Sequence, residues 1–219
     1  MQSFVTLASA SPRRRNLLAA MGIAFDVQSA DIDETPCPGE DPERLVRRLS
    51  AAKAEAVAGD GIIIAADTVV VADGRVLGKP NSAQEATRTL CALRGRSHQV
   101  FSGLAVLDPG RDRACVQVAT SPVRMRDYCD DEIAAYVASG DPMDKAGAYA
   151  IQHQGFSPVA AIEGCYANVM GFPICHLYRL LTAWEMHAPV HPLDCCPLAL
   201  QEACPYAEGI LTSPLPEGC

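Results

Sequence analysis

Residues 61–72, GIIIAADTVVVA, are the longest apolar run in the chain, and one acid, Asp67, stands near the centre of that run. The β-branched residues and the Asp73-Gly74 pair that follows predict a buried strand turning into a second, antiparallel strand. A run of this length, interrupted by an acid, is too short for a membrane-spanning helix. The run therefore predicts a sheet inside a folded core.

Strand and helix signals alternate along the rest of the chain. Apolar periodicity and capping residues predict helices over residues 11–22, 41–59, 82–95, 130–140 and 174–187. Strands are expected over residues 3–9, 23–32, 98–108 and 114–125, the last two as an antiparallel pair. We expect an α/β protein with a mixed sheet.

Composition excludes several classes of protein. With 219 residues, of which 49% are hydrophobic and 20% charged, the chain can bury a core as one large domain or two closely joined lobes. A formal net charge of -8 argues against general nucleic-acid binding. The sequence shows neither a charged-then-apolar leader nor a membrane span, so we expect a cytoplasmic protein without a membrane partner.

Three consecutive arginines, Arg13 to Arg15, follow Ser11 and Pro12, which suit the start of a helix. Positive charge in a first turn opposes the helix dipole, so this turn predicts a bound anion, with backbone N–H groups and guanidinium forks holding a phosphate. Successive helix residues point about 100° apart, which favours Arg13 and Arg14 as the pair that faces one ligand. The alternative is a solvated basic turn.

Asp67 needs a cation, because a carboxylate in so apolar a strand is costly to bury alone. We expect a metal ion or an ammonium group beside it, unless the acid ends the strand at the surface. Glu34, in the segment DIDET, is a candidate for a second oxygen ligand of magnesium or manganese. Asp31 and Asp33 compete for that role, and solvated loop acids are the alternative.

Two lysines are candidates for holding phosphate. Lys53 falls beside the apolar face of its predicted helix, and Lys79 follows a glycine after the predicted hairpin. The alternative for Lys53 is a side chain that lies along apolar surface with its ammonium in water. The segment GRVLGKP, residues 74–80, lacks the spacing and the Ser or Thr of a phosphate-binding P-loop, so that motif is excluded.

The segment DKAGAYAIQ, residues 144–152, combines a charged pair with a glycine and an amide. Gln152 can donate and accept hydrogen bonds at once, which suits the edge of a nucleobase, and Lys145 is a candidate for binding the same substrate. A turn ion pair and a surface glutamine are the alternatives.

Seven blocks of the sequence together resemble the Maf family of nucleoside triphosphate pyrophosphatases, over about residues 4–184. The blocks are LASASPRRRNLL, DIDET, AAKA, AADTVVVADGRVLGKP, GRSHQVFSGLAV, YVASGDPMDKAGAYAIQ and IEGCYANVMGFP. The resemblance implies an elongated α/β fold with a mixed sheet, flanking helices and a cleft between two lobes. It also implies a divalent cation, Mg²⁺ or Mn²⁺, a homodimer, and hydrolysis of a nucleoside triphosphate to the monophosphate and pyrophosphate.

The resemblance also implies roles for single residues. Ser9, Arg13 and Arg14 would line the triphosphate site, Glu34 and Asp67 would serve metal and water, Lys53 and Lys79 would hold phosphate, and Gln152 would read the base. The form of the Gln152 block is similar to that of the branch acting on dTTP and UTP. Four positions depart from the usual family residues: Ser102, Asp141, His153 and Cys165. These departures concern the choice of base more than catalysis.

Two other functions remain open at this point. One is a non-catalytic nucleotide-binding regulator, because the family is linked with septum formation and cell division. The other is a serine hydrolase using Ser9 or Ser11, although the GxSxG elbow of such enzymes is absent from the sequence. His98, in GRSHQVF, is expected to be a hydrogen-bonded structural histidine rather than a base.

The chain is expected to divide at residue 186. Residues 1–186 would form the nucleotide pyrophosphatase domain, and residues 187–219, rich in proline and cysteine, a flexible extension. Most of the ten cysteines are expected to act as small buried hydrophobes. A zinc or iron-sulfur site is the alternative in the extension, formed from His187, His191, Cys195, Cys196 and Cys204.

Overall fold

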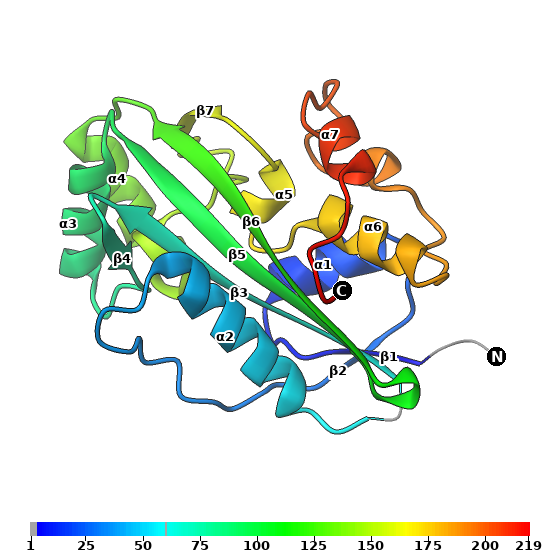
Figure 1. Ribbon diagram of the computed structural model, residues 1–219. Coiled ribbons are helices and arrows are strands. Elements are labelled where there is room, and N and C mark those ends of the chain that lie inside the picture. The colour runs from blue at the N-terminus through cyan, green and yellow to red at the C-terminus, as the bar shows by residue number, and fades with distance from the viewer. Residues whose placement is uncertain (1–3, 60) are drawn as a thin grey trace. The chain divides into compact units, whose positions relative to one another are not determined.

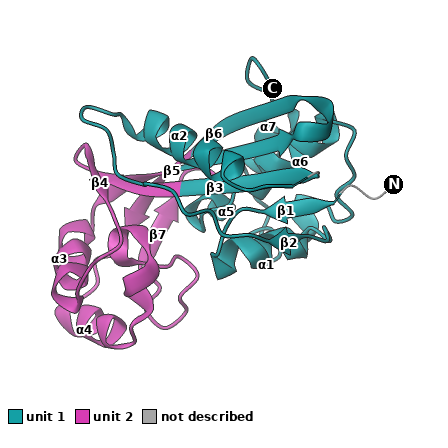
Figure 2. Cartoon of the chain, turned by 90° about the horizontal axis from the view of Figure 1, so that it is seen from below, with its two compact units in different colours: residues 1–67, 102–119, 165–219 teal, residues 68–101, 120–164 magenta. Residues whose placement is uncertain are grey.

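The computed structural model describes residues 4–59 and 61–219. Its chain divides into two compact units, shown in two colours in Figure 2. Unit 1 comprises residues 1–67, 102–119 and 165–219, and unit 2 comprises residues 68–101 and 120–164. Three long strands contribute residues to both units: β3 (Ile62–Ala72), β5 (Ser97–Asp108) and β6 (Arg113–Met125).

Within the described residues, seven strands form one mixed sheet in the order β2-β1-β3-β5-β6-β7, with β4 paired to β3 outside this path. Strand β1 (Val5–Leu7) runs parallel to both β2 (Asp26–Val27) and β3. Strands β4 (Arg75–Leu77) and β7 (Val159–Ile162) are antiparallel to β3 and β6, respectively. The predicted mixed α/β class is therefore confirmed, whereas the elongated shape and the cleft stay predictions.

The predicted turn after the apolar strand is confirmed. Asp73 and Gly74 have φ angles of 50° and 71°, and they join β3 to β4 with Ala72 opposite Arg75. Positive φ at both central positions gives a turn whose twist matches that of the flanking strands, which is why Asp-Gly is favoured there. Strands β5 and β6, which correspond to the predicted strand pair, are neighbours in the sheet and are joined by the short turn η1 (Pro109–Arg111).

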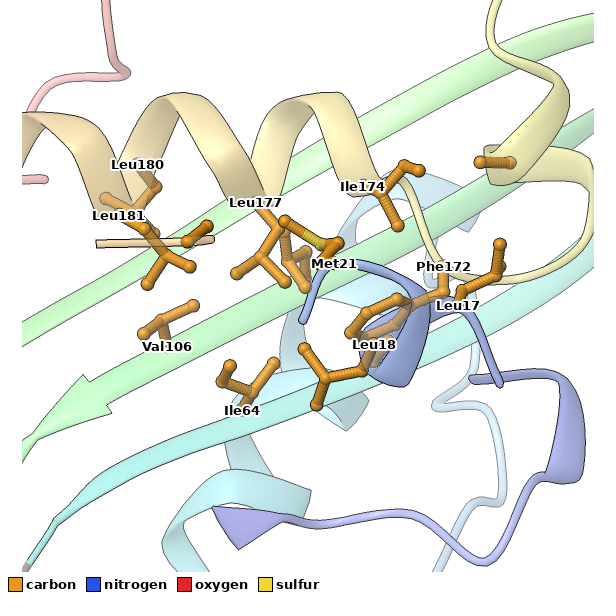
Figure 3. Packing of buried hydrophobic residues seen from close by; sticks show 14 of the residues in the cluster. Leu17, Leu18, Met21, Ile64, Val106, Phe172, Ile174, Leu177, Leu180 and Leu181 are labelled. Carbon is orange, nitrogen blue, oxygen red and sulfur yellow. The ribbon is translucent and has the colours of Figure 1, made fainter. Parts of the chain in front are cut away.

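Strand β3 separates two hydrophobic clusters in unit 1. Ile62, Ile64 and Ala66 belong to the larger cluster, with residues of α1 (Pro12–Ala20) and α6 (Ile174–Ala183). Figure 3 shows Ile64 beside residues of these two helices. Ile63 and Ala65 belong to a smaller cluster at the end of α2 (Pro42–Glu55). Because successive strand residues point to opposite faces, α1 and α6 cover one face of the sheet and α2 covers the other (Figure 1).

Helix α2 lies directly on the sheet because β5 offers a glycine beneath it. A Cβ atom at Gly103 would stand only 2.1 Å from the Val46 carbonyl oxygen, so any other residue would push the helix away. The helix begins as predicted, with the Asp41 carboxylate accepting the Arg44 backbone N–H at 3.0 Å and Pro42 in the first position. This close seating brings Lys53, near the end of the helix, down to the sheet.

Unit 2 carries the other two predicted helices, α3 (Ala83–Leu93) and α4 (Asp130–Ala138), which pack against each other. The Ser82 hydroxyl accepts the Glu85 N–H at 3.2 Å and so caps α3. Two short turns follow α4: η2 (Asp141–Asp144) and η3 (Ala146–Ala148). The strand expected over residues 23–32 is reduced to Asp26–Val27, because its one neighbour, β1, is itself only three residues long.

The segment after residue 186 differs from the expected flexible extension, because it is folded onto unit 1 as η4 (Pro192–Asp194), α7 (Ala207–Thr212) and connecting turns. Its buried residues Ala188, Cys195 and Cys196 join the larger hydrophobic cluster. No compact unit begins at residue 187. These apolar residues lie in short turns without helical or strand periodicity, so the sequence pattern did not indicate their burial.

Hydrogen bonds and a disulfide also hold this segment. The Arg179 guanidinium of α6 donates to the Ile210 carbonyl at 3.2 Å and to Ser213, and the Trp184 indole N–H donates to the Cys219 carbonyl at 3.1 Å. Cys219 forms a disulfide with Cys115 of β6.

The remaining cysteines fall into two groups. Cys165, Cys175, Cys195 and Cys196 are buried thiols, as expected, whereas Cys37, Cys91 and Cys129 are exposed and Cys204 is partly exposed. Within residues 4–59 and 61–219, no three His, Cys, Asp or Glu side chains are grouped closely enough to hold a metal ion, which disfavours the zinc or iron-sulfur alternative. No helix among these residues is long and apolar enough to cross a membrane.

Candidate active site

The first part of the candidate site is the loop between β1 and α1. Helix α1 begins at Pro12 after Ser11, as predicted, and its first turn contains no acid that could offset the arginines. Ser9 is buried, and its Oγ accepts the Ser11 backbone N–H at 3.3 Å. This hydrogen bond folds the loop over the start of the helix. Both features fit the predicted anion site.

Arg14 crosses from α1 to two other segments of unit 1. Its guanidinium donates to the Ala66 carbonyl at 2.5 Å, to the Gly171 carbonyl at 2.9 Å and to Ser9 Oγ at 3.3 Å. Burial lowers the pKa of Arg14, whereas the charge of Asp67 acts in the opposite direction. Arg14 thus ties the arginine turn to the middle of strand β3, next to Asp67.

Lys53, Glu34 and Asp67 form a charged group that we call the Lys53 triad. The Lys53 ammonium lies 2.6 Å from Asp67 Oδ1 and 2.6 Å from Glu34 Oε1. The side chains of Lys53 and Asp67 are 10% and 8% exposed, whereas that of Glu34 is 53% exposed. The prediction that Asp67 lies beside a cation is correct, and in this structure the cation is an ammonium group.

The fold explains how these three residues meet. Lys53 continues the buried face of α2 that contains Val46 and Leu49, so its side chain is directed at the sheet. Asp67 ends the part of β3 that belongs to unit 1, and Glu34 lies in the loop between β2 and α2. A buried lysine paired with two carboxylates avoids the large cost of an isolated buried charge.

The three acids of the DIDET segment differ in their contacts. Glu34 contacts Lys53, whereas the Asp33 carboxylate accepts the Thr35 backbone N–H at 2.9 Å. Hydrogen bonds from the Thr35 side chain and then from its backbone lower the pKa of Asp33. Asp31 is exposed. Of the three acids, Glu34 is therefore the one that the fold directs toward Asp67.

Charges of both signs meet in this part of unit 1. The electrostatic neighbours that act on Arg14 are Asp67, Arg13 and Glu34, in decreasing order of strength. Together with Lys53, the group contains three cations and two carboxylates. It can bind an anion, and the two carboxylates offer the hard oxygen atoms that magnesium and manganese prefer.

Lys79, Lys145 and Gln152 belong to unit 2, so their convergence with Asp67 stays a prediction. Lys79 is exposed and forms no ion pair with any residue that the structure describes. Gln152 is partly exposed, and its amide makes no hydrogen bond within the described chain. Both side chains are available to a ligand.

Lys145 is already engaged inside unit 2. Its ammonium donates to the Asp141 carbonyl at 2.5 Å, to Asp141 Oδ1 at 3.0 Å and to Asp144 Oδ1 at 2.6 Å. Asp141 Oδ2 in turn accepts the Tyr136 hydroxyl proton at 2.6 Å. Three contacts use the three donors of the ammonium, so Lys145 fixes the turns that precede Gln152.

The structure adds groups that the sequence did not indicate. The Ala66 and Gly171 carbonyl oxygens anchor Arg14, and a backbone carbonyl carries no signal of residue type that could have revealed them. Ser9 Oγ contacts the Ser11 N–H and Arg14, neither of which can act as a base, so nothing here activates Ser9 as a nucleophile. His98 is a buried, hydrogen-bonded residue, as expected, with Nε2 at 2.7 Å from the Tyr149 hydroxyl.

Comparison with known proteins gives a family, two close relatives and one solved structure. The family model described as Maf-like protein matches residues 4–184. A dTTP/UTP pyrophosphatase of Dictyoglomus thermophilum is 47% identical over 186 residues, covering 83% of this chain and 96% of that protein. A dTTP/UTP pyrophosphatase of Moorella thermoacetica is 48% identical over 182 residues, covering 82% and 94%. The structure of a HAM1 protein from Coxiella burnetii gives a TM-score of 0.44 at 16% identity, covering 84% of this chain and 98% of that one.

Proposed function

The chain belongs to the Maf-like protein family, and from this premise we propose that it is a nucleoside triphosphate pyrophosphatase. Its substrates are dTTP and UTP, or modified pyrimidine nucleotides, and its products are the monophosphate and pyrophosphate. Relatives at 47% and 48% identity that carry the name dTTP/UTP pyrophosphatase support this activity. The observation that carries the proposal is the buried Asp67 carboxylate beside Lys53, with Arg14 tied to the adjacent residue of β3.

The arginine turn binds the phosphates in this proposal. The charge of the triphosphate is neutralised by Arg13 and Arg14, at the start of α1, and by Lys79. Lys79 forms no ion pair with any residue that the structure describes. Ser9 holds Arg14 and the loop in place. A helix N-terminus with guanidinium groups is suited to this task because its backbone N–H groups and the side chains attract the same anion.

Glu34 and Asp67 fit a divalent cation, Mg²⁺ or Mn²⁺, which usually takes one or two protein carboxylates together with phosphate and water. When bound there, such an ion supplies Lewis-acid polarisation of a phosphoryl oxygen. Both residues supply carboxylate oxygens, which are the preferred protein ligands of these ions. Lys53 would remain close to both carboxylates.

The proposed reaction is an in-line attack of water on the α-phosphorus. A bond forms between the water oxygen and the phosphorus, and the bond from the phosphorus to the oxygen bridging to the β-phosphate breaks, so pyrophosphate leaves with the bonding electron pair. Asp67 serves this step either as the base that accepts the water proton or as a metal ligand, and both roles require its carboxylate. Arg13, Arg14 and Lys79 stabilise charge on the departing pyrophosphate.

Unit 2 would supply recognition of the base. The Gln152 amide can donate to one carbonyl of a pyrimidine and accept from its N3–H, and no contact inside the described chain occupies it. Lys145 supports this region through Asp141 and Asp144. We further propose that the protein is a cytoplasmic homodimer acting on free nucleotides rather than on nucleic acid.

A panel of nucleotides tests the function. Purified full-length protein would be assayed for pyrophosphate release from dTTP, UTP, CTP, dATP and modified pyrimidine triphosphates, with Mg²⁺ or Mn²⁺. We expect dTTP and UTP, or a modified pyrimidine nucleotide, to give the highest kcat/KM. Binding of nucleotide without pyrophosphate release from any member of the panel would contradict the proposal and favour a non-catalytic regulator.

Gln152→Ala tests the assignment of the base contact. We expect KM for dTTP and UTP to rise by about tenfold, because one or two hydrogen bonds to the base are lost, with little change in kcat. The matched control is Gln154→Ala, an exposed glutamine two residues away. Equal kinetics of Gln152→Ala and the wild-type protein would exclude Gln152 as the contact.

A further inference from the structure

The Lys53 triad already contains a cation where the proposed function places a metal ion. The Lys53 ammonium lies 2.6 Å from one oxygen of each carboxylate to which we assign the divalent cation. The side chains of Lys53 and Asp67 are 10% and 8% exposed, so water screens their interaction only weakly. The chain's own ammonium group thus neutralises part of the charge that would attract a metal ion.

An ammonium group and a divalent cation compete for the same carboxylates. A metal ion bound to Asp67 or Glu34 would lie within a few ångströms of the Lys53 ammonium, and like charges at that separation repel strongly where water is scarce. Arg14 increases the repulsion, because it is electrostatically coupled to both carboxylates and hydrogen-bonded to Ala66, next to Asp67. A divalent cation entering alone therefore meets two positive side chains.

A nucleoside triphosphate changes this balance. Its phosphates bring several negative charges, and they offer oxygen atoms both to a metal ion and to the lysine. Lys53 has a flexible four-carbon stem and three donors, of which the two carboxylates use two in the described structure. The ammonium can turn one donor to a phosphate oxygen while the metal ion approaches the carboxylates.

We propose that Lys53 is a positioning residue that occupies the metal position of the nucleotide-free protein, so that the divalent cation binds weakly alone and enters together with the triphosphate. This inference rests on the assignment of Glu34 and Asp67 as metal ligands in the proposed function. It adds a specific order of binding, in which the metal-nucleotide complex, rather than the free metal ion, is the species that the protein captures.

Manganese binding to nucleotide-free protein tests the inference without any turnover. Mn²⁺ affinity would be measured by electron paramagnetic resonance for the wild-type protein, Lys53→Met and Lys53→Arg. Removing the positive charge should raise the Mn²⁺ affinity by at least about tenfold in Lys53→Met, whereas Lys53→Arg, which keeps the charge, should stay close to the wild-type value. An unchanged or lower affinity of Lys53→Met would overturn the inference.

Two control variants locate the effect. Arg44→Met removes a positive charge at the other end of α2, where the Arg44 side chain is 82% exposed and paired with Asp41, and it should leave Mn²⁺ affinity unchanged. Adding Asp67→Asn to Lys53→Met should abolish the gained affinity, because the gain depends on the Asp67 carboxylate. A gain that survives in this double variant would place the Mn²⁺ elsewhere and overturn the inference.

A second measurement covers the case in which Lys53→Met does not fold, since it leaves Asp67 buried without its partner. Mn²⁺ affinity of the wild-type protein would be compared with and without α,β-imido-dUTP, whose nitrogen bridge resists hydrolysis. We expect the nucleotide analogue to tighten Mn²⁺ binding by at least about tenfold, beyond its own affinity for Mn²⁺ in solution. Equal affinities would overturn the inference.

These outcomes separate the inference from the proposed function. If the wild-type protein releases pyrophosphate but Lys53→Met does not change the Mn²⁺ affinity, the inference is overturned and the proposed function is retained. If Lys53→Met binds Mn²⁺ about tenfold more tightly but the wild-type protein hydrolyses no nucleotide of the panel, the Lys53 ammonium competes with the metal ion and the proposed function is wrong.

Discussion

Each unit contains one buried lysine between two carboxylates, yet the two groups are built differently. In unit 1, Lys53 joins Glu34 and Asp67, which come from a loop and a strand far apart in the sequence. In unit 2, Lys145 joins Asp141 and Asp144, its neighbours within four residues. The lysine side chains are similarly buried, at 10% and 8% exposed.

The two groups differ in how many hydrogen-bond donors of the lysine remain for a ligand. Lys145 also donates to the Asp141 carbonyl, so its three donors are used to fix a local turn. Lys53 has one donor beyond its two carboxylates, and Arg14 lies on a neighbouring segment. A local ion-pair cluster is thus suited to hold a loop, whereas a cluster assembled from distant segments is suited to receive a charged substrate.

Matched carboxylate substitutions should give the largest contrast between the two groups. Asp67→Asn removes the group that serves water or metal and should lower kcat by about 10³-fold or more. Asp141→Asn keeps its oxygen for Tyr136 and should lower kcat less than about tenfold. Steady-state pyrophosphate release measures both, with circular dichroism to check folding. Similar losses in the two variants would remove the functional distinction between the units.

The disulfide gives unit 1 a constraint that unit 2 lacks in the described chain. Cys115 and Cys219 are 104 residues apart, so the crosslink restricts the unfolded chain over a long loop. Cys219→Ser should lower the free energy of unfolding by about 3 to 4 kcal/mol. Urea denaturation under non-reducing conditions measures the loss. Cys204→Ser, which alters a thiol outside the disulfide, is the control. A stability equal to that of the wild-type protein would show that the bond does not form in solution.

Acid should weaken both units through one histidine in each, His98, which is buried, and His176, which is partly buried. Burial lowers the pKa of His98 in unit 2 and of His176 in unit 1 to about 4, from the usual 6.5 of a histidine in water. Between these values the unfolded chain binds more protons than the folded one, so stability should fall as the pH drops from about 6.5 to 4, by about 2 to 3 kcal/mol per histidine.

Single variants assign this pH dependence. The free energy of unfolding would be measured by urea titration at several pH values. In His98→Gln, the loss of this free energy between pH 6.5 and 4 should be smaller by about 2 to 3 kcal/mol, the contribution of one histidine. His176→Gln should give the same reduction. If the units unfold together, each variant changes the one shared transition; if they unfold separately, each changes only its own. A curve with the wild-type slope in both variants would contradict the assignment.

Lys145→Met should have the smallest effect of this series. It leaves Asp141 and Asp144 without their cation, but both carboxylates reach water, at 33% and 62% exposed. We expect a loss of about 2 kcal/mol in the free energy of unfolding, less than for a fully buried pair. Urea denaturation measures it, with Lys79→Met, an exposed lysine, as the control within about 0.5 kcal/mol. A loss no larger than that of the control would show that the cluster does not hold the turns.

Local signals predicted much of the fold. Asp41 with Pro42 and Ser82 with Glu85 mark helix starts that form as predicted, and Asp73-Gly74 forms the predicted turn. The cation expected at Asp67 was also correct. These predictions were correct because each of these features depends on neighbouring residues or on the cost of burying one charge.

Other features had no local signal. The sequence could not tell that the cation at Asp67 would be Lys53, or that Glu34 rather than Asp31 or Asp33 would share it. The packing of the segment after residue 186 was missed because its contacts, such as those of Arg179 with Ser213, join residues more than thirty positions apart.

The sequence alone therefore determined which residues carry charge, where the longer helices and the hairpin turn form, and which family this chain resembles. The tertiary structure decided which charges meet, because only the seating of α2 on the sheet at Gly103 brings an ammonium to a carboxylate of β3. Hydrogen bonds and apolar periodicity act over a few residues and can be recognised locally. Electrostatic partners are selected by distance in space, which the chain acquires only on folding.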